Sequence, residues 1–267
     1  MPLSNDGDRR RYAGVVIDLD GVCYRENDPV PGSCEAVERL RAAGIGIAFA
    51  TNNATRTPEQ TADKLRSMGF DLDTDEIVTS AIAAADLVEP GTRCLVIGMD
   101  GLREALRRRG CALVDDPEDA EAVLTGLDRE LTYEKLVRGT RALLAGARFI
   151  ASNADHSYPA ADGISPGAGV IMVALETASG RRAEVAGKPE AALFTSAAAR
   201  LPAGDLLMIG DKLETDIAGA AALGWDTALV LTGVTDRSQL DGADPTPTWV
   251  ADDLATLVDD LLDRHPA

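Results

Sequence analysis

The sequence is poor in the residues that build several common kinds of site. Its 267 residues include two histidines and four cysteines, and aromatic side chains make up only 4% of the chain. Two histidines, one of them almost at the C-terminus, exclude a histidine-rich metal site and make histidine-driven catalysis unexpected. The cysteines show no Cys-x-x-Cys spacing, so we expect reduced, mostly buried thiols and no zinc or disulfide framework. They are Cys23, Cys34, Cys94 and Cys111.

Positive charge and long apolar stretches are also scarce. The chain carries 26 Lys and Arg against 44 Asp and Glu, which gives a formal net charge of −18. A surface of this sign repels nucleic acid and anionic membranes, so neither is an expected partner. Because no run of about 18 apolar residues occurs, no membrane-spanning helix is predicted. The polar N-terminus does not resemble a signal peptide, and the cytoplasm is the expected location.

Aliphatic residues supply what the aromatics do not. Hydrophobic residues make up 45% of the chain, which is enough for a sizeable core. Short apolar runs alternate with segments of helical periodicity along the whole chain, which favours an α/β fold with doubly wound parallel sheets. The Pro-Gly pair at 90–91 indicates a domain boundary near this point. Residues 153–169 are rich in Gly, Pro and Ala and are predicted to form a loop.

Polar side chains of complementary kinds follow four predicted strands. Parallel strands bring their carboxyl ends to one edge of a sheet, so these groups are expected to converge. Carboxylates, a hydroxyl, an amide and an ammonium group together suit a phosphoryl group held by a hard cation such as Mg²⁺ and by Lys and hydroxyl donors. The residues are Asp18 and Asp20, Thr51 and Asn52, Lys188, and Asp211 with Asp216.

Each of these residues has a plainer interpretation when it is taken alone. The acids around Asp18 could form a turn after a strand, because Asp and Gly are common turn residues. Lys188 could be a surface lysine, and Asp211 could cap the helix that follows it. These interpretations would have to hold at four strand ends at once, and we therefore reject them jointly.

Four short motifs carry a resemblance to a known family. Asp-Leu-Asp-Gly-Val at 18–22, Thr-Asn-Asn at 51–53, Gly-Lys-Pro at 187–189 and Gly-Asp-Lys-Leu-Glu-Thr-Asp at 210–216 resemble the motifs of the haloacid dehalogenase-like hydrolases, in that family's order. The long insert between the second and third motifs is similar to the larger αβ cap, of C2 type, in subclass IIA. That subclass contains p-nitrophenyl phosphatase-like, glycerol-3-phosphate, phosphoglycolate and nucleotide phosphatases.

The resemblance implies a domain organisation. A Rossmann-like, doubly wound parallel-sheet core would be discontinuous and comprise residues 1–80 and 185–267. An inserted αβ cap domain would comprise residues 81–184, and its βα pattern is complete enough for a core of its own.

The resemblance also implies catalytic roles. Asp18 would be the nucleophile that forms an aspartyl-phosphate. Asp20 would protonate the leaving oxygen and then activate the hydrolytic water. The Thr51 hydroxyl and the Asn52 backbone N–H would hold phosphoryl oxygens, and Lys188 would neutralise the nucleophile and the transferring group.

Magnesium binding is implied in the same way. Asp18, the carbonyl of Asp20 and Asp211 would bind Mg²⁺, and Asp216 would support these ligands from behind or through a bound water. Cys23 departs from the family pattern, because relatives usually carry an aliphatic residue there. We favour a small buried apolar side chain at this position over an oxidation-sensing thiol.

The predicted function is that of a Mg²⁺-dependent phosphatase acting on a small phosphomonoester. One alternative is a phosphotransferase or phosphomutase of the same family. Another is a phospho-accepting signalling module, against which Asp20, Asp216 and the large insert argue, because a switch needs neither acid–base catalysis nor a cap. The oligomeric state is open, with a homodimer as one alternative.

In subclass IIA the cap loop that faces the catalytic Asp sets substrate specificity, and residues 152–169 resemble that loop. Residues 149–180 contain no Lys or Arg, so a second anionic group on the substrate would gain no cation there. The expected substrate is therefore a polyol phosphate such as glycerol 3-phosphate, with a nucleoside monophosphate or 2-phosphoglycolate as the alternative. The candidate specificity residues are Asn153, Asp155, His156 and Tyr158.

Overall fold

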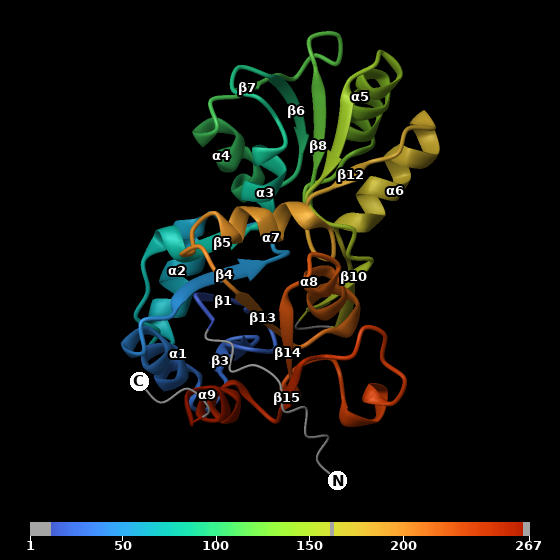
Figure 1. The fold of residues 1–267 in the computed structure, drawn as a ribbon. Coiled ribbons are helices and arrows are strands. Elements are labelled where there is room, and N and C mark those ends of the chain that lie inside the picture. The colour runs from blue at the N-terminus through green and yellow to red at the C-terminus, as the bar shows by residue number, and fades with distance from the viewer. Residues whose placement is uncertain (1–11, 161–162, 264–267) are drawn as a thin grey trace. The chain divides into compact units, whose positions relative to one another are not determined.

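The computed structural model describes residues 12–160 and 163–263. Within these residues the chain groups into two compact units. The first unit combines the N-terminal part up to residue 48 with the C-terminal part from residue 201, and the second unit comprises residues 49–200 (Figure 1). Two distant stretches of sequence therefore build the first unit together.

A parallel sheet forms the centre of the first unit. Its strands run in the order β15-β14-β13-β1-β4, and each described pair in the part from β15 to β1 is parallel. All four residues of β1 are buried, as expected for a β-branched strand covered on both faces. The strands are β1 (Gly14–Ile17), β4 (Gly46–Thr51), β13 (Leu206–Gly210), β14 (Asp226–Val230) and β15 (Trp249–Ala251).

Helices from both ends of the chain join in this unit. Helix α1 (Ser33–Ala42) contacts α9 (Leu254–Asp263), and each buries one apolar stripe (Figure 1). A turn of π-helix, η2 (Leu213–Ile217), leads from β13 into α8 (Ala218–Ala222). Shorter elements are the hairpin of β2 (Tyr24–Arg25) with β3 (Asp28–Pro29) and the 3-10 helix η3 (Arg237–Leu240).

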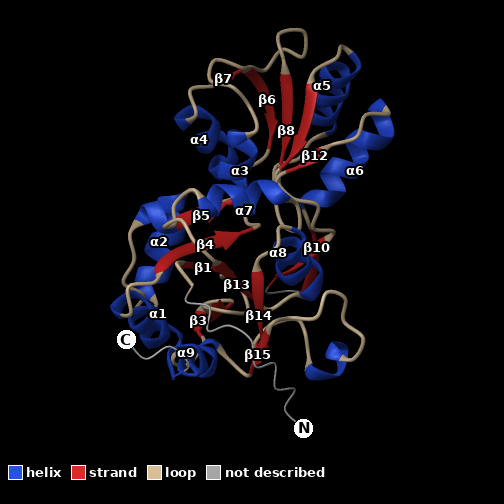
Figure 2. Ribbon diagram, viewed as in Figure 1, coloured by secondary structure: helices blue, strands red, loops and turns tan. Residues whose placement is uncertain are grey.

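The second unit has a parallel sheet of its own, in the order β12-β9-β8-β6-β7. Leu95 and Ile97 of β6 point into a core that includes Leu143 and Leu175, from helices on one face. The strands are β6 (Arg93–Ile97), β7 (Ala112–Leu113), β8 (Ala122–Thr125), β9 (Arg148–Ala151) and β12 (Glu184–Val185). Helices α5 (Tyr133–Leu144) and α6 (Ala168–Ser179) supply that core, and α4 (Asp100–Arg108) lies across the sheet from them (Figure 2).

A smaller group of elements completes the second unit. The last residues of β4 pair in parallel with β5 (Ile77–Thr79). Thr57 and Gln60 form a reciprocal capping box with Pro58 at the first turn, which explains why α2 (Pro58–Ser67) begins there. The remaining elements are the 3-10 helix η1 (Thr74–Glu76), α3 (Ser80–Asp86) and α7 (Ala191–Ala198).

The α/β class and the parallel sheets predicted from the sequence are confirmed. Strand β6 lies in the second sheet, as an inserted domain requires. The predicted division into a core at 1–80 and 185–267 and a cap at 81–184 stays a prediction. The compact units have other boundaries, because α2, β5, α3 and α7 group with the second sheet.

The prediction that residues 153–169 form a loop without strands is wrong. These residues contain an antiparallel hairpin of β10 (Ser157–Ala160) and β11 (Gly163–Pro166). The pairing uses backbone groups, so the Gly and Pro residues that suggested a loop do not prevent it. A strand without further neighbours tolerates proline.

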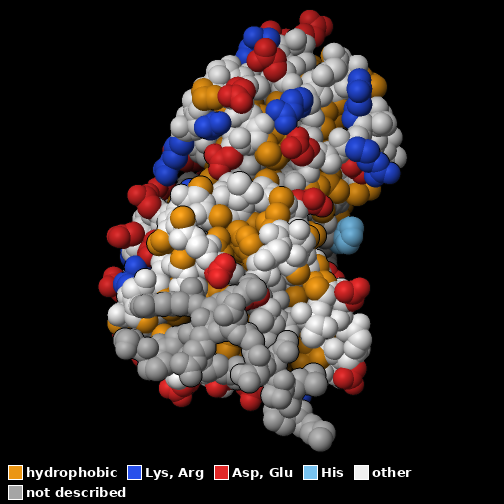
Figure 3. Space-filling view, viewed as in Figure 1, with side chains coloured by type: hydrophobic (Ala, Val, Ile, Leu, Met, Phe, Trp, Pro, Cys, Tyr) orange, Lys and Arg blue, Asp and Glu red, His pale blue; other side chains and the backbone are white. Residues whose placement is uncertain are grey.

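The surface reflects the composition. Asp and Glu side chains are spread over the face shown in Figure 3. Within the described part of the chain, no helix has both the length and the hydropathy needed to cross a membrane.

Candidate active site

Three carboxylates come together in the first unit. Asp18, Asp211 and Asp216 each place one oxygen within 4.8 Å of the others. Asp18 directly follows β1, and its N–H donates to the Ile209 carbonyl at 2.9 Å, which holds the end of β1 against β13. The exposed fractions of the three acids are 9%, 4% and 0% in that order. The sequence prediction that these acids converge is thus met by the fold.

Backbone groups hold two of the acids in place. The Val234 N–H donates to Asp211 Oδ2 at 2.7 Å, and the Lys212 N–H donates to Asp216 Oδ2 at 3.1 Å. A Cβ at Gly233 would overlap the Asp211 carboxylate, so only glycine permits this close approach of the loop after β14. Gly233 was missed from the sequence because it lies more than 20 residues from its partner and belongs to no recognised motif.

The carboxylate cluster fits a hard divalent cation. Mutual repulsion and desolvation make three nearly buried carboxylates costly unless a cation lies among them. All the donors are oxygens, which suits Mg²⁺ and disfavours a native zinc site, for which His and Cys are the typical ligands. The residues present therefore fit the magnesium site that the motifs implied.

Asp20 lies outside this cluster. Its side chain is exposed, and the hydroxyl of Tyr24 donates to its Oδ2 at 3.0 Å. Burial, together with the nearby charge of Asp20, raises the pKa of Tyr24, so the phenol stays a hydrogen-bond donor. Sequence reasoning missed Tyr24, because an aromatic residue after a buried run is usually part of the core.

A second polar group forms in the second unit, around the end of β4. The Lys188 N–H donates to Asn52 Oδ1 at 2.8 Å, and Lys188 Nζ donates to the Ala50 carbonyl at 3.4 Å. The Asn53 N–H donates to Thr51 Oγ1 at 3.1 Å. Thr51 and Lys188 are each only 4% exposed. The structure thus brings the second and third motifs together.

The reason for this convergence differs from the predicted one. Lys188 follows β12, which belongs to the second sheet and does not share an edge with β1. Hydrogen bonds between the two loops, not a common sheet edge, bring Lys188 to Asn52. The sequence pattern could not reveal this, because β12 has only two residues and its partner strand is set by tertiary contacts.

The predicted specificity residues differ in their surroundings. Asn153 is buried, and its amide donates to the Asn52 carbonyl at 2.7 Å. Asp155 accepts a long hydrogen bond of 3.4 Å from Asn52 Nδ2. His156 is exposed and Tyr158 is half-buried. Asn153 and Asp155 thus face the Asn52 loop, and a specificity role for these four residues stays a prediction.

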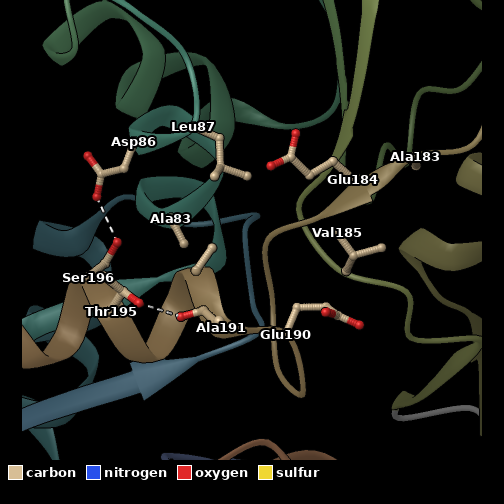
Figure 4. A pocket seen from close by; sticks show the side chains of 11 residues that line it. Ala83, Asp86, Leu87, Ala183, Glu184, Val185, Glu190, Ala191, Thr195 and Ser196 are labelled. Atoms are coloured by element: carbon tan, nitrogen blue, oxygen red, sulfur yellow. Dashed lines mark hydrogen bonds between the residues drawn. The ribbon is translucent and has the colours of Figure 1, made fainter. Parts of the chain in front are cut away.

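A cavity of about 610 Å³ in the second unit is a poor phosphate site (Figure 4). Its charged lining residues are Asp86, Glu184 and Glu190, all of them carboxylates that repel a phosphate. Asp86 accepts a hydrogen bond of 2.7 Å from Ser196, and Glu184 pairs with Arg148. We therefore assign no catalytic role to this cavity.

The thiols are expected to differ in reactivity. Cys34 is partly exposed, whereas Cys23, Cys94 and Cys111 are buried. Burial, followed by the charge of Asp18, raises the pKa of Cys23, which disfavours the reactive thiolate. In the native protein, an aromatic disulfide reagent should therefore modify one thiol quickly and the other three slowly.

The control for this expectation is Cys34→Ser, which should remove the fast phase. Rapid modification of Cys23 in the folded protein would contradict the assignment of a buried, unreactive side chain and would favour redox sensing.

Comparisons with known proteins agree with the motifs. A model of the haloacid dehalogenase-like hydrolases matches residues 15–112, and a related HAD-hydrolase-like model matches residues 185–257. An acid sugar phosphatase of Staphylococcus haemolyticus is 37% identical over 257 residues, which cover 94% of this chain and 97% of that protein.

Solved structures show the same relationship. A p-nitrophenyl phosphatase from Archaeoglobus fulgidus has 36% identity and a TM-score of 0.88, covering 93% of this chain and 99% of that one. A glycerol phosphate phosphatase from Mycobacterium tuberculosis, in complex with magnesium, has 36% identity and a TM-score of 0.86, covering 92% of this chain and 76% of that one. The resemblance seen in the four motifs is confirmed, and the chain belongs to the haloacid dehalogenase-like hydrolases.

Proposed function

We propose that this protein is a Mg²⁺-dependent phosphatase that hydrolyses a small polyol phosphate, such as glycerol 3-phosphate, through an aspartyl-phosphate. The observation that carries the reaction class is the cluster of Asp18, Asp211 and Asp216 in a chain of this hydrolase family. The three relatives described above are each named a phosphatase, which supports the same class.

The proposed reaction has two steps. A carboxylate oxygen of Asp18 attacks phosphorus, the bond from phosphorus to the ester oxygen breaks, and Asp20 gives its proton to the leaving alcohol. Asp20 then takes a proton from water, which attacks phosphorus and releases Asp18 and inorganic phosphate.

The remaining motif residues act on charge and position. Lys188 and the Thr51 hydroxyl stabilise the phosphoryl oxygens, whose charge changes most in the transition state. Bound Mg²⁺ would supply positive charge beside the nucleophile, and Asp18, Asp211 and the carbonyl of Asp20 would hold it, with Asp216 behind them. Tyr24 keeps the Asp20 carboxylate in one orientation through its hydrogen bond.

The charge of the cap loop supports the polyol substrate. Residues 149–180 hold no Lys or Arg. The Asp155 carboxylate can accept a hydrogen bond from a substrate hydroxyl group, and the Tyr158 hydroxyl can donate one to it. Related proteins that are named for sugar phosphates and glycerol phosphate fit this chemistry. A substrate with a second anionic group would meet carboxylate there and gain no counter-charge.

The substrate prediction is tested by comparing kcat/KM. Glycerol 3-phosphate and a sugar monophosphate should exceed 2-phosphoglycolate and a nucleoside monophosphate under one buffer and one Mg²⁺ concentration. A tenfold lead for either alternative substrate, about 1.4 kcal/mol of transition-state binding, would contradict the charge argument.

Two arginine variants sharpen this comparison. His156→Arg places a cation in the exposed part of the loop and should raise kcat/KM for 2-phosphoglycolate relative to glycerol 3-phosphate. Leu144→Arg adds the same charge at the exposed end of α5 and should leave the ratio unchanged. If the ratio of kcat/KM for 2-phosphoglycolate to that for glycerol 3-phosphate is equal in both variants, the charge of the loop does not affect substrate selection.

A phosphotransferase would share the first step but pass the phosphoryl group to an acceptor hydroxyl. Release of inorganic phosphate without an added acceptor excludes it. A phospho-accepting module would show no turnover of p-nitrophenyl phosphate.

A further inference from the structure

The side chain of Asn52 forms two hydrogen bonds with the main chain of Lys188. Its Oδ1 accepts from the Lys188 N–H at 2.8 Å, and its Nδ2 donates to the Lys188 carbonyl at 3.1 Å. We propose that this side chain is a positioning residue for the Lys188 ammonium, held in turn by Asn153. The inference rests on the proposed function, because it assigns Lys188 to the phosphoryl group.

The two hydrogen bonds fix the backbone from which the lysine side chain starts. Gly187 makes the contact possible, since a Cβ there would crowd Asn52 Oδ1 and the Ser152 carbonyl, at 2.6 and 2.7 Å. A lysine side chain has a flexible stem of four carbons, and fixing it in one conformation costs side-chain entropy. A fixed main chain, with Lys188 Nζ donating to the Ala50 carbonyl at 3.4 Å, lowers that cost.

Asn52 is itself held from two sides. Its carbonyl oxygen accepts from Ser80 Oγ and from Asn153 Nδ2, both at 2.7 Å. The long hydrogen bond to Asp155 completes the set and requires that the Nδ2 end of the Asn52 amide faces that carboxylate. The orientation of the amide is therefore determined by its neighbours, with its acceptor toward the Lys188 N–H.

This geometry gives the second motif two separable parts. The Asn52 backbone N–H is the group assigned to the phosphoryl oxygens, whereas the side chain is hydrogen-bonded to the Lys188 main chain and, by the longer bond, to Asp155. Substitution by alanine keeps the N–H and removes only the side chain. Asn153, a candidate for substrate specificity by sequence, acts here on the Asn52 carbonyl and hence on catalysis with every substrate.

Asn53 provides the matched control. It is the next residue and the same amino acid, but it is exposed, and its side chain accepts hydrogen bonds from the Thr55 N–H and hydroxyl, at 2.9 and 2.6 Å. Asn53→Ala therefore removes two side-chain hydrogen bonds from the same loop without touching Lys188.

The experiment measures kcat and KM for p-nitrophenyl phosphate in Asn52→Ala, Asn53→Ala, Lys188→Met and the double variant Asn52→Ala/Lys188→Met. Displacing a charge that acts on the transition state should lower kcat of Asn52→Ala roughly 10- to 100-fold with KM changed less than about threefold. Asn53→Ala should stay within about threefold of the wild type. In the Lys188→Met background, Asn52→Ala should add less than about threefold, because residues that act as a unit are not additive.

Other results would overturn the proposal. If Asn52→Ala behaves like Asn53→Ala, or if its loss multiplies with that of Lys188→Met, the side chain does not act through Lys188. Should Asn52→Ala fail to fold, Asn153→Ala replaces it with a predicted loss of about three- to tenfold in kcat for glycerol 3-phosphate and p-nitrophenyl phosphate alike. A loss confined to one substrate would return Asn153 to substrate specificity. A wild type without turnover would instead contradict the proposed function, so the two failures are distinguishable.

Discussion

Replacement of Asp18 by asparagine should bring phosphate release down to the background of the assay, a loss on the order of 10⁴-fold or more. The amide is neither a nucleophile nor a good ligand for Mg²⁺, yet it has nearly the same size as the carboxylate. Asp18 is 9% exposed and lies at the end of β1, so the fold should persist. Rapid-quench labelling should find no phosphoenzyme in this variant.

Asp20→Asn should be the informative companion. Loss of the general acid and base should lower kcat about 10²- to 10⁴-fold, which is the usual contribution of this kind of catalysis. The exposed carboxylate of Asp20 is not one of the three clustered acids, so the substitution should leave that cluster unchanged. Phosphoenzyme should still form from p-nitrophenyl phosphate, whose leaving group needs little protonation, and should then persist.

An acidic residue elsewhere in the first unit serves as the control for both variants. Asp205→Asn changes an exposed carboxylate just before β13 and should leave kcat unchanged. Appreciable steady-state turnover by Asp18→Asn, with Asp205→Asn normal, would exclude the covalent mechanism.

Removal of divalent cations should abolish turnover, and added Mg²⁺ should restore it. The carboxylates of Asp18, Asp211 and Asp216 lie within 4.8 Å of one another, so phosphate transfer onto Asp18 without a cation would add charge to an already repelling cluster. Calcium should inhibit, because its looser and higher coordination would disturb the alignment of Asp18 with the phosphorus atom.

A binding measurement separates the metal site from catalysis. Mg²⁺ should raise the melting temperature of the wild type, since a ligand at 100 times its Kd stabilises the native state by about 2.7 kcal/mol. The rise should disappear in Asp211→Asn and persist in Asp205→Asn. Full activity in excess chelator, or an equal shift in both variants, would contradict the assigned site.

Much of the fold and of the first-unit site could be predicted from local patterns. The β-branched run at β1, the alternation of strands and helices and the acids after β1 and β13 identified an α/β fold and a carboxylate cluster. These signals are readable because burial and periodicity act within short windows. The hairpin at β10 and β11 was missed, because its pairing uses backbone groups and the Gly- and Pro-rich sequence there has no strand pattern.

The amino-acid sequence by itself determined the chemistry of this protein: which carboxylates, hydroxyl and ammonium are present, at what spacing, and with no Lys or Arg in residues 149–180. Only the tertiary structure decided how the second and third motifs meet. Lys188 follows a strand of the second sheet and is joined to Asn52 by hydrogen bonds across 136 residues of chain. Gly233 and Tyr24 likewise acquire their roles from neighbours, Asp211 and Asp20, that only the folded chain places against them. Side-chain identity is local, whereas a hydrogen bond between distant loops depends on every element that packs between them.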